Sequence, residues 1–271
     1  MLRALAERVA AAQTARTNPR AILLSGSVAA GTADFHSDLD ILLYHDRLPT
    51  DGALAAARRD VGGGESTDLA PPEPDERMET YTVDGVDVQI GHVTIERWER
   101  TIRSLVEGRD PESAEQKAVE GLFYGIPLHG AELIERWRAE AVYSDALQRA
   151  MVERHWRFPP IWYVADRVLS RDAAIWRQEM LVDASFNLLG VLAGLNRVWY
   201  SRFQFKRMRS FTAKLELAPP DLADRLERVF SAEPSAGIAE LEELVAETQK
   251  LLREHLPEVD ASLRFPPGTR A

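Results

Sequence analysis

Cysteine is absent from the 271-residue sequence, and so are long apolar runs and a basic charge balance. Without cysteine the chain can form neither disulfides nor thiolate metal sites, which is compatible with the cytoplasmic location that we expect. The longest apolar stretch, Leu188 to Leu195, is far too short to cross a membrane, so we expect no membrane partner. Charged residues interrupt Met1 to Ala12, which therefore does not resemble a secretory signal.

The charge balance is acidic, because 33 Lys and Arg residues face 43 Asp and Glu residues, a net charge of −10. Binding of nucleic acid depends on the neutralisation of phosphates by Lys and Arg, so nucleic acid is not an expected partner. A cationic small molecule suits an acidic chain better. The length allows one large domain or two small ones with a substantial core. Nothing in the sequence indicates an oligomeric state.

The stretch from Ala21 to Tyr44 carries the most specific pattern. Its apolar beginning, Ala21 to Leu24, predicts a buried strand that ends at the turn Ser25-Gly26-Ser27. Because glycine has no Cβ, Gly26 would allow a phosphate to approach the backbone closely, and N–H groups in such a turn can bind an anion. We expect the Ser27 hydroxyl to contact the phosphate, with Ser25 and Ser37 as second choices.

Two carboxylates follow on the next predicted strand. Residues two apart in a strand share a face, so Leu39 and Ile41 point to one side while Asp38 and Asp40 point to the other. Neighbouring carboxylates repel each other unless a cation lies between them. Mg²⁺ is the expected ion, because it binds carboxylates together with substrate phosphates.

A third acidic residue lies in a hairpin predicted for residues 79–93, with Asp84-Gly85 as its turn. In the second strand of this hairpin, Val88 and Ile90 form an apolar face and Asp87 points to the opposite side. The alternative for Asp87, as for the Asp38 and Asp40 pair, is a solvated position on a strand without a metal.

Gly26-Ser27, Gly31, Ser37 and Asp38-x-Asp40 together resemble the signature of the DNA polymerase β-like nucleotidyltransferase superfamily. The resemblance implies an α+β fold, with an N-terminal domain of a mixed sheet flanked by helices and a C-terminal helical bundle. It also implies an enzyme that uses ATP and two Mg²⁺ ions and releases pyrophosphate. Asp38, Asp40 and Asp87 would be the metal ligands and catalytic residues, and Asp87 could take the proton of the acceptor.

Gly108 to Pro111 is the predicted domain boundary. We expect a catalytic domain at residues 1–108, a helical domain for substrate and nucleotide binding at 109–262, and a tail at 263–271. Beyond the boundary the pattern is helical and no strand pattern recurs. The predicted helices are Glu112 to Phe123, Ala131 to His155, Pro160 to Leu169, Ala173 to Tyr200, Pro219 to Phe230 and Ser235 to Leu256.

A basic segment, Asn196 to Lys214, contains six Lys and Arg residues and no acidic one. It is either a solvated face or a source of cations for the triphosphate. The residues from Arg197 to Ser201 resemble the Arg-[Ile/Val]-Trp-Tyr-Ser segment of streptomycin/spectinomycin-type aminoglycoside nucleotidyltransferases. This resemblance implies that Arg197 contacts the nucleotide phosphates. The lysine that the family uses as well has no exact counterpart here, and Lys206 and Arg209 are the nearest substitutes.

The acceptor site is the least defined part. Trp176, Glu179 and Asp183 share a face of a predicted helix, and an aromatic ring with two acids suits a polycationic sugar. The alternative places Trp176 in the bundle core, where Trp156 and Trp162 are also expected.

The predicted function is transfer of an NMP, AMP from ATP, to a hydroxyl of a small cationic acceptor such as an aminoglycoside, which would confer antibiotic resistance. The alternatives are a protein- or RNA-modifying, antitoxin-like nucleotidyltransferase and a degenerate nucleotide-binding module.

Overall fold

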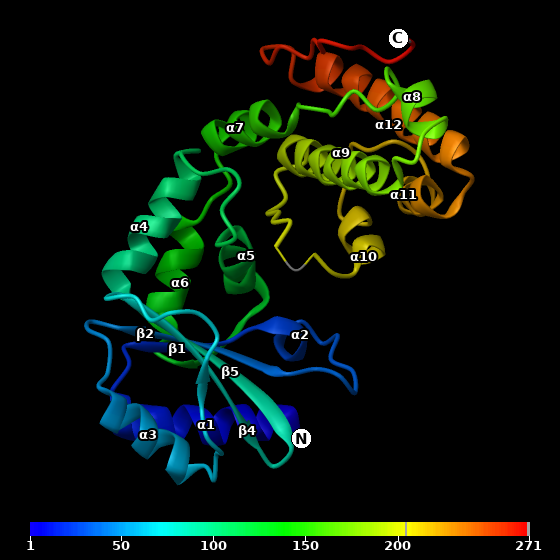
Figure 1. Ribbon diagram of the computed structural model, residues 1–271. Coiled ribbons are helices and arrows are strands. Elements are labelled where there is room, and N and C mark those ends of the chain that lie inside the picture. Colours follow the sequence, from blue (N-terminus) through cyan, green and yellow to red (C-terminus); the bar gives the residue numbers. More distant parts are fainter. Residues whose placement is uncertain (204, 270–271) are drawn as a thin grey trace. The chain divides into compact units, whose positions relative to one another are not determined.

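The computed structural model describes residues 1–203 and 205–269, and the chain divides into two compact units (Figure 1). The first unit comprises Met1–Ser104 and Ala118–Val142, and the second comprises Leu105–Lys117 and the chain from Tyr143 onward. The predicted boundary at Gly108 to Pro111 lies within Leu105–Lys117, the first segment of the chain that belongs to the second unit. The sequence pattern did not indicate that residues 118–142 belong to the first unit.

A mixed six-stranded sheet forms the centre of the first unit, in the order β3-β4-β5-β2-β1-β6. Strands β2 and β5 pair in parallel, and the other neighbouring pairs are antiparallel. The α+β class and the hairpin are therefore confirmed. The strands are β1 Ala21–Leu24, β2 Leu39–His45, β3 Thr67–Asp68, β4 Glu76–Val83, β5 Val86–Thr94 and β6 Ile126–His129.

Strand β6 contradicts the expectation that only helices follow residue 108. It pairs with β1 at the edge of the sheet, with Pro127 opposite Leu23. Proline lacks a backbone N–H and is tolerated at sheet edges, whereas in sequence it argues against a strand. A four-residue segment that contains proline therefore carries no recognisable strand pattern.

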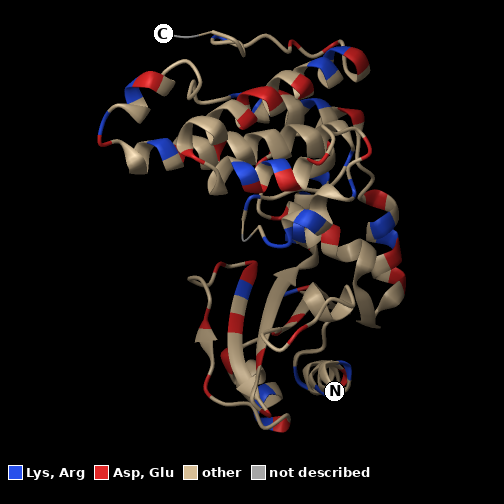
Figure 2. Cartoon of the chain, turned by 90° about the vertical axis from the view of Figure 1, so that its right-hand side faces the viewer, with Lys and Arg blue, Asp and Glu red and all other residues tan. Residues whose placement is uncertain are grey.

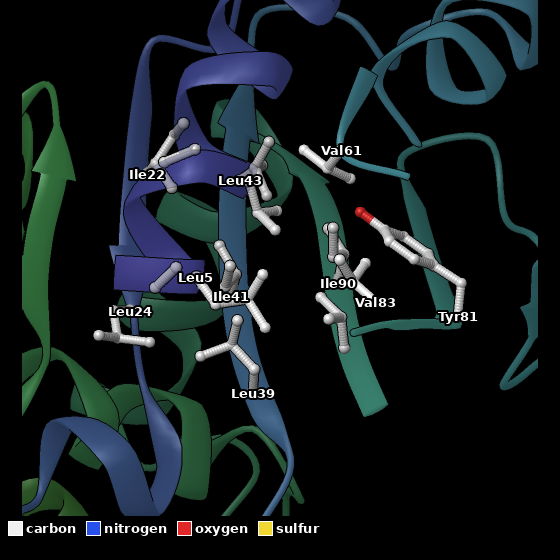
Figure 3. Close-up of a cluster of buried hydrophobic side chains, with 14 residues drawn as sticks. Leu5, Ile22, Leu24, Leu39, Ile41, Leu43, Val61, Tyr81, Val83 and Ile90 are labelled. Atoms are coloured by element: carbon white, nitrogen blue, oxygen red, sulfur yellow. The ribbon is translucent and has the colours of Figure 1, made fainter. Parts of the chain in front are cut away.

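Helices pack on the sheet of the first unit. The core lies between α1 and the alternate residues of β2 and β5, such as Leu39, Ile41 and Ile90, all almost fully buried (Figure 3). On the opposite face of β2, Tyr44 contacts Trp98 of α4 and Trp137 of α6, with ring centroids 5.4 and 4.6 Å apart. The helices are α1 Leu2–Thr17, α2 Gly26–Ala29, α3 Asp51–Asp60, α4 Ile95–Val106, α5 Gln116–Tyr124 and α6 Ala131–Glu140.

The second unit contains a helical bundle, as predicted. The predicted helix from Ala131 to His155 is in fact two helices, because Ser144 caps a new one by accepting a hydrogen bond from Leu147 N at 3.0 Å. Trp156 and Trp162 are buried, as expected for the core. The helices are α7 Asp145–His155, α8 Ala165–Leu169, α9 Ala174–Leu195, α10 Met208–Thr212, α11 Leu222–Ser231 and α12 Pro234–His255.

None of the helices in the described residues has both the length and the apolar composition that a membrane crossing requires.

Candidate functional site

The turn after β1 is tied to the Asp-x-Asp strand. Ser25 N donates to Asp40 O at 2.9 Å, and Gly26 has a φ of +65°. A Cβ at Gly26 would lie only 1.8 Å from Asp40 Oδ2. The missing side chain that the sequence pattern linked to a phosphate therefore makes room for the carboxylate of Asp40.

The register of β2 and β5 determines how the acidic residues are grouped. Leu39 lies opposite Val88, and Asp40 lies opposite Gln89. Asp38 directly precedes β2, so continuing this register places it beside Asp87. Since Leu39 and Val88 are buried against α1, all three aspartates belong to the other face of the sheet. The predicted orientation of Asp87 relative to its strand is confirmed.

Asp38 and Asp87 each accept a hydrogen bond from a neighbouring side chain. Gln89 Nε2 donates to Asp38 Oδ2 at 2.6 Å, and Thr82 Oγ1 donates to Asp87 Oδ1 at 3.0 Å. Among residues 1–203 and 205–269, no three His, Cys, Asp or Glu side chains lie close enough together to hold a metal ion. Three hard oxygen donors on one sheet face fit Mg²⁺ by their chemistry, but their convergence on one ion stays a prediction.

The predicted phosphate-binding serines differ in their surroundings. Ser37 forms a local cap, because its Oγ accepts from Asp34 N at 2.8 Å and contacts Asp34 Oδ1 at 3.1 Å. Ser27 is half-buried, and its carbonyl accepts from Thr32 N at 2.9 Å. Of the two, Ser27 is the better placed to offer its hydroxyl to a ligand.

Helix α5 contributes residues to this region that the sequence did not indicate. A Cβ at Gly121 would lie 2.7 Å from Ser25 Oγ, so the helix backbone packs closely against the turn. The side chain of Tyr124 interacts with the hydroxyl of Ser25. Burial, reinforced by the negative charges of Glu120 and Asp40, raises the pKa of Tyr124, so the phenol stays protonated. No local pattern links this helix to the turn, because the contact joins residues about 100 positions apart.

The basic segment of the second unit is largely neutralised by nearby acids. Figure 2 shows acidic and basic residues interspersed along the helices of this unit. Arg197 pairs with Asp145 and donates to Gln148 Oε1 at 3.0 Å. Arg209 bridges two carboxylates of α11, one of which is Asp224 at 2.6 Å. Lys206 is exposed.

The predicted acceptor residues lie on the first half of α9. Trp176 is 48% exposed and Glu179 is exposed, so the alternative that Trp176 belongs to the bundle core is wrong. Asp183 accepts from Arg202 Nη2 at 2.8 Å, which offsets its charge. Trp176 and Glu179 therefore remain accessible to a ligand, while Asp183 has a competing partner.

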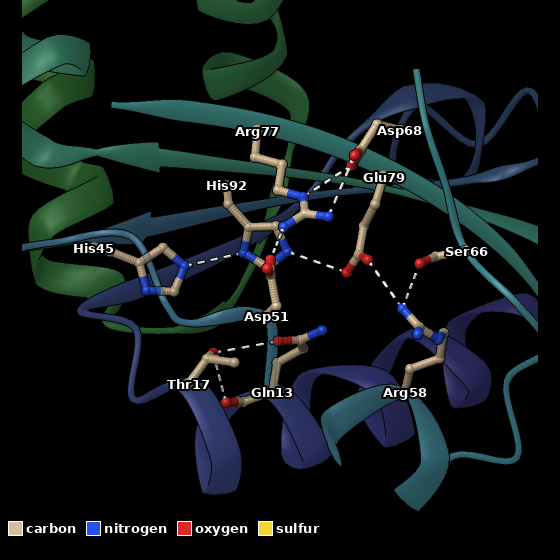
Figure 4. Close-up of polar contacts among 10 residues, drawn as sticks. All are labelled: Gln13, Thr17, His45, Asp51, Arg58, Ser66, Asp68, Arg77, Glu79 and His92. Atoms are coloured by element: carbon tan, nitrogen blue, oxygen red, sulfur yellow. Dashed lines mark hydrogen bonds and ion pairs between the residues drawn. The ribbon is translucent and has the colours of Figure 1, made fainter. Parts of the chain in front are cut away.

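A buried polar network occupies the opposite face of the sheet (Figure 4). His45 Nε2 lies 3.1 Å from His92 Nδ1, His92 Nε2 lies 3.5 Å from Glu79 Oε1, and Arg58 Nη1 lies 3.2 Å from Glu79 Oε2. Burial, with a smaller contribution from His92, lowers the pKa of His45 to about 3. Both histidines lie on the face of the sheet opposite the aspartates and belong to the buried interior of the first unit.

The chain matches no protein-family model and no curated protein. It is similar to the crystal structure of a nucleotidyltransferase-like protein from Exiguobacterium sibiricum, with a TM-score of 0.34 and 14% identity over 89% of this chain and 75% of that one. It is also similar to the Cid1 poly(U) polymerase, with a TM-score of 0.28 and 16% identity over 90% of this chain and 66% of that one. Similarities this distant carry no argument about activity.

Proposed function

We propose that the protein is a nucleotidyltransferase that moves AMP from ATP to a hydroxyl group of a small acceptor. The shared face of Asp38, Asp40 and Asp87, next to the turn at Gly26, is the observation that supports the proposal most. Asp38 and Asp40 would hold Mg²⁺, with Asp87 as the third ligand. When bound, Mg²⁺ supplies charge stabilisation and alignment for the transfer.

The chain's own residues would act on the proton and the phosphates. The acceptor oxygen forms a bond to the α-phosphorus, and the bond to pyrophosphate breaks. Asp87, exposed at the beginning of β5, is available to take the proton that the acceptor hydroxyl loses. Ser27 would donate its hydroxyl to the β- or γ-phosphate, while the close packing of Gly121 and the interaction of Tyr124 with Ser25 would keep the turn in place.

We assign a further contact to the nucleotide phosphates, and the binding of the acceptor, to residues of the helical unit. Lys206 is the leading phosphate ligand, because Arg197 and Arg209 would first have to exchange a carboxylate for a phosphate. The acceptor is a small cation such as an aminoglycoside. The net charge of −10 and the exposed Trp176 and Glu179 support this choice.

The test is incubation with ATP, Mg²⁺ and a panel of aminoglycosides, followed by pyrophosphate release and mass spectrometry of the acceptor. An AMP adduct is expected, and Asp40→Asn should slow its formation at least about a hundredfold, since the metal site supplies several kcal/mol. Asp84→Asn is the matched control, because Asp84 lies in the hairpin turn and pairs with Arg8 at 2.8 Å.

AMP label on a co-purified protein or RNA, without a small-molecule adduct, would favour the macromolecule-modifying alternative. Absence of pyrophosphate release with every acceptor, or equal rates in Asp40→Asn and the wild type, would refute the transferase proposal.

A further inference from the structure

A concave pocket of about 480 Å³ is built entirely from residues of the second unit. The segment from Trp156 to Pro159 lines one part of it, and the C-terminal segment from Ser262 to Phe265 lines another. Trp162 and two residues of α9, Asp183 and Asn187, complete it. Pockets of this size hold small-molecule ligands. Nothing in the transferase proposal uses it.

Hydrogen bonds hold the two lining segments in place. Trp156 Nε1 donates to Ser262 O at 3.2 Å, and Trp162 Nε1 donates to Phe265 O at 3.0 Å. Part of the segment that the sequence predicted to be a tail is therefore fixed against the bundle. Trp156 and Trp162 are almost fully buried, so the aromatic surface open to a ligand comes from Phe158 and Phe265, which are partly exposed.

Phe158 and Phe265 bring one aromatic ring from each lining segment to the pocket. Phe158 packs edge-on against Trp156, with ring centroids 5.1 Å apart. Phe265 stacks on Tyr163 at 4.4 Å and is partly exposed. Flat apolar walls of this kind favour a planar ring over a branched or spherical ligand.

The charge of the pocket is positive, although the protein is acidic. Arg157 and Arg264 come from the two lining segments, are exposed, and form no ion pair with a carboxylate of the described residues. Arg264 Cζ lies 5.2 Å from the ring centroid of Phe265, which keeps its guanidinium beside the aromatic surface. Among the described lining residues Asp183 is the only acid, and its carboxylate accepts a hydrogen bond from Arg202.

We propose that this pocket binds a small aromatic anion, a planar ring that carries a carboxylate or a phosphate. The ring would lie against Phe158 and Phe265, and the anionic group would accept charge-assisted hydrogen bonds from Arg157 and Arg264. A neutral ring loses these bonds, and a cationic ring is repelled by both guanidinium groups. The proposal does not depend on nucleotidyl transfer.

Calorimetric titration of the full chain with indole-3-acetate, indole-3-acetamide and tryptamine tests it, because the three share one ring and differ in charge. The acetate should bind at least about tenfold more tightly than the amide, and tryptamine should bind weakest. Titration with AMP and with adenosine, which differ only in the phosphate, tests whether the anionic group can be a phosphate. AMP binding that depends on the two arginines extends the ligand class to phosphates, and AMP binding that does not depend on them restricts it to carboxylates.

The double variant Arg157→Gln/Arg264→Gln should reduce the affinity for indole-3-acetate to that for the amide. Arg171→Gln, which removes an exposed positive charge outside the lining, should leave it unchanged. Both pocket arginines are exposed, so an unchanged thermal unfolding midpoint is expected. Equal affinities for the three indoles, no measurable binding at millimolar concentration, or full affinity in the double variant would overturn the proposal.

Discussion

Lowering the pH from 7.5 to 5.0 should destabilise the protein through His45. The side chain is 1% exposed, and its Nδ1 is buried without a hydrogen-bond partner in the described residues. Burial keeps the folded-state pKa near 3, against 6.5 for a free histidine. In the unfolded chain the same imidazole is solvated and takes up a proton as the pH falls below 6.5.

The sign and size follow from proton linkage. Between pH 6.5 and 3 the unfolded state binds one proton more than the folded state at His45, so stability falls as the pH falls. The slope is about 1.4 kcal/mol per pH unit, which gives a loss of about 2 kcal/mol between pH 6.5 and 5.0. Above pH 6.5 the contribution is constant. Asp60, whose pKa an ion pair with Arg16 lowers from 3.8, titrates below pH 5.0 and so does not contribute between pH 6.5 and 5.0.

Urea denaturation at half-unit pH steps, followed by circular dichroism, measures this dependence. His45→Gln removes the titrating group and should flatten the slope below pH 6.5 by about one proton, whatever its effect at pH 7.5. His129→Gln removes an exposed histidine of the same unit and should retain the wild-type slope. Burial also lowers the pKa of His155, which belongs to the second unit. Its effect on stability is the same in both variants and does not change the comparison of their slopes. Identical slopes in His45→Gln and the wild type would refute this account.

Three further substitutions test the packing of the candidate site and the bundle. Gly26→Ala should cost at least about 2 kcal/mol of unfolding free energy, because its φ is +65° and its Cβ would overlap Asp40 Oδ2. Tyr124→Phe removes the hydroxyl that interacts with Ser25 and should cost about 1 kcal/mol and slow AMP transfer several-fold. Arg225→Ala removes the buried cation that pairs with both Glu240 and Glu247 of α12, leaving Arg228 to pair with Glu240 alone, and should cost about 3 kcal/mol in urea denaturation.

Matched controls separate these effects from general damage. Gly62→Ala introduces the same backbone strain at a φ of +74° where nothing lies within 4 Å of a new Cβ, so it should cost less than Gly26→Ala. Arg209→Ala removes an exposed cation between two acids and should change stability far less than Arg225→Ala. Equal losses within either pair would contradict the packing argument. For Tyr124→Phe, the contradicting outcome is an unchanged transfer rate.

Alternation along β2 and β5 was readable in the sequence because a strand has a period of two and one face must be buried. Leu39 and Ile41 therefore indicated where Asp38 and Asp40 would point. Contacts between distant segments carried no such signal. The approach of Gly121 to Ser25 and the pairing of Arg197 with Asp145 depend on tertiary packing. The local pattern therefore predicted on which face of the sheet each aspartate lies, but not which residues of distant segments contact the site.

The pairing of Arg197 with Asp145 allows its predicted role in nucleotide binding to be tested. Arg197 has a φ of 54° and donates to Tyr143 O at 3.2 Å, so its backbone and side chain are held within the second unit. A phosphate contact requires the guanidinium to give up the Asp145 carboxylate. Asp145→Asn weakens that competition and should lower the KM for ATP up to about fivefold, since exposed ion pairs are weak.

Arg197→Ala should raise the KM for ATP. In the double variant, Asp145→Asn should no longer lower this KM, because the two changes act on the same guanidinium. A purely structural pair behaves differently: either substitution then lowers the thermal unfolding midpoint and leaves the KM for ATP unchanged. Steady-state kinetics on the two single variants and the double variant, with unfolding midpoints measured in parallel, distinguish the two roles. An unchanged KM in all three would place the nucleotide phosphates with Lys206 or elsewhere.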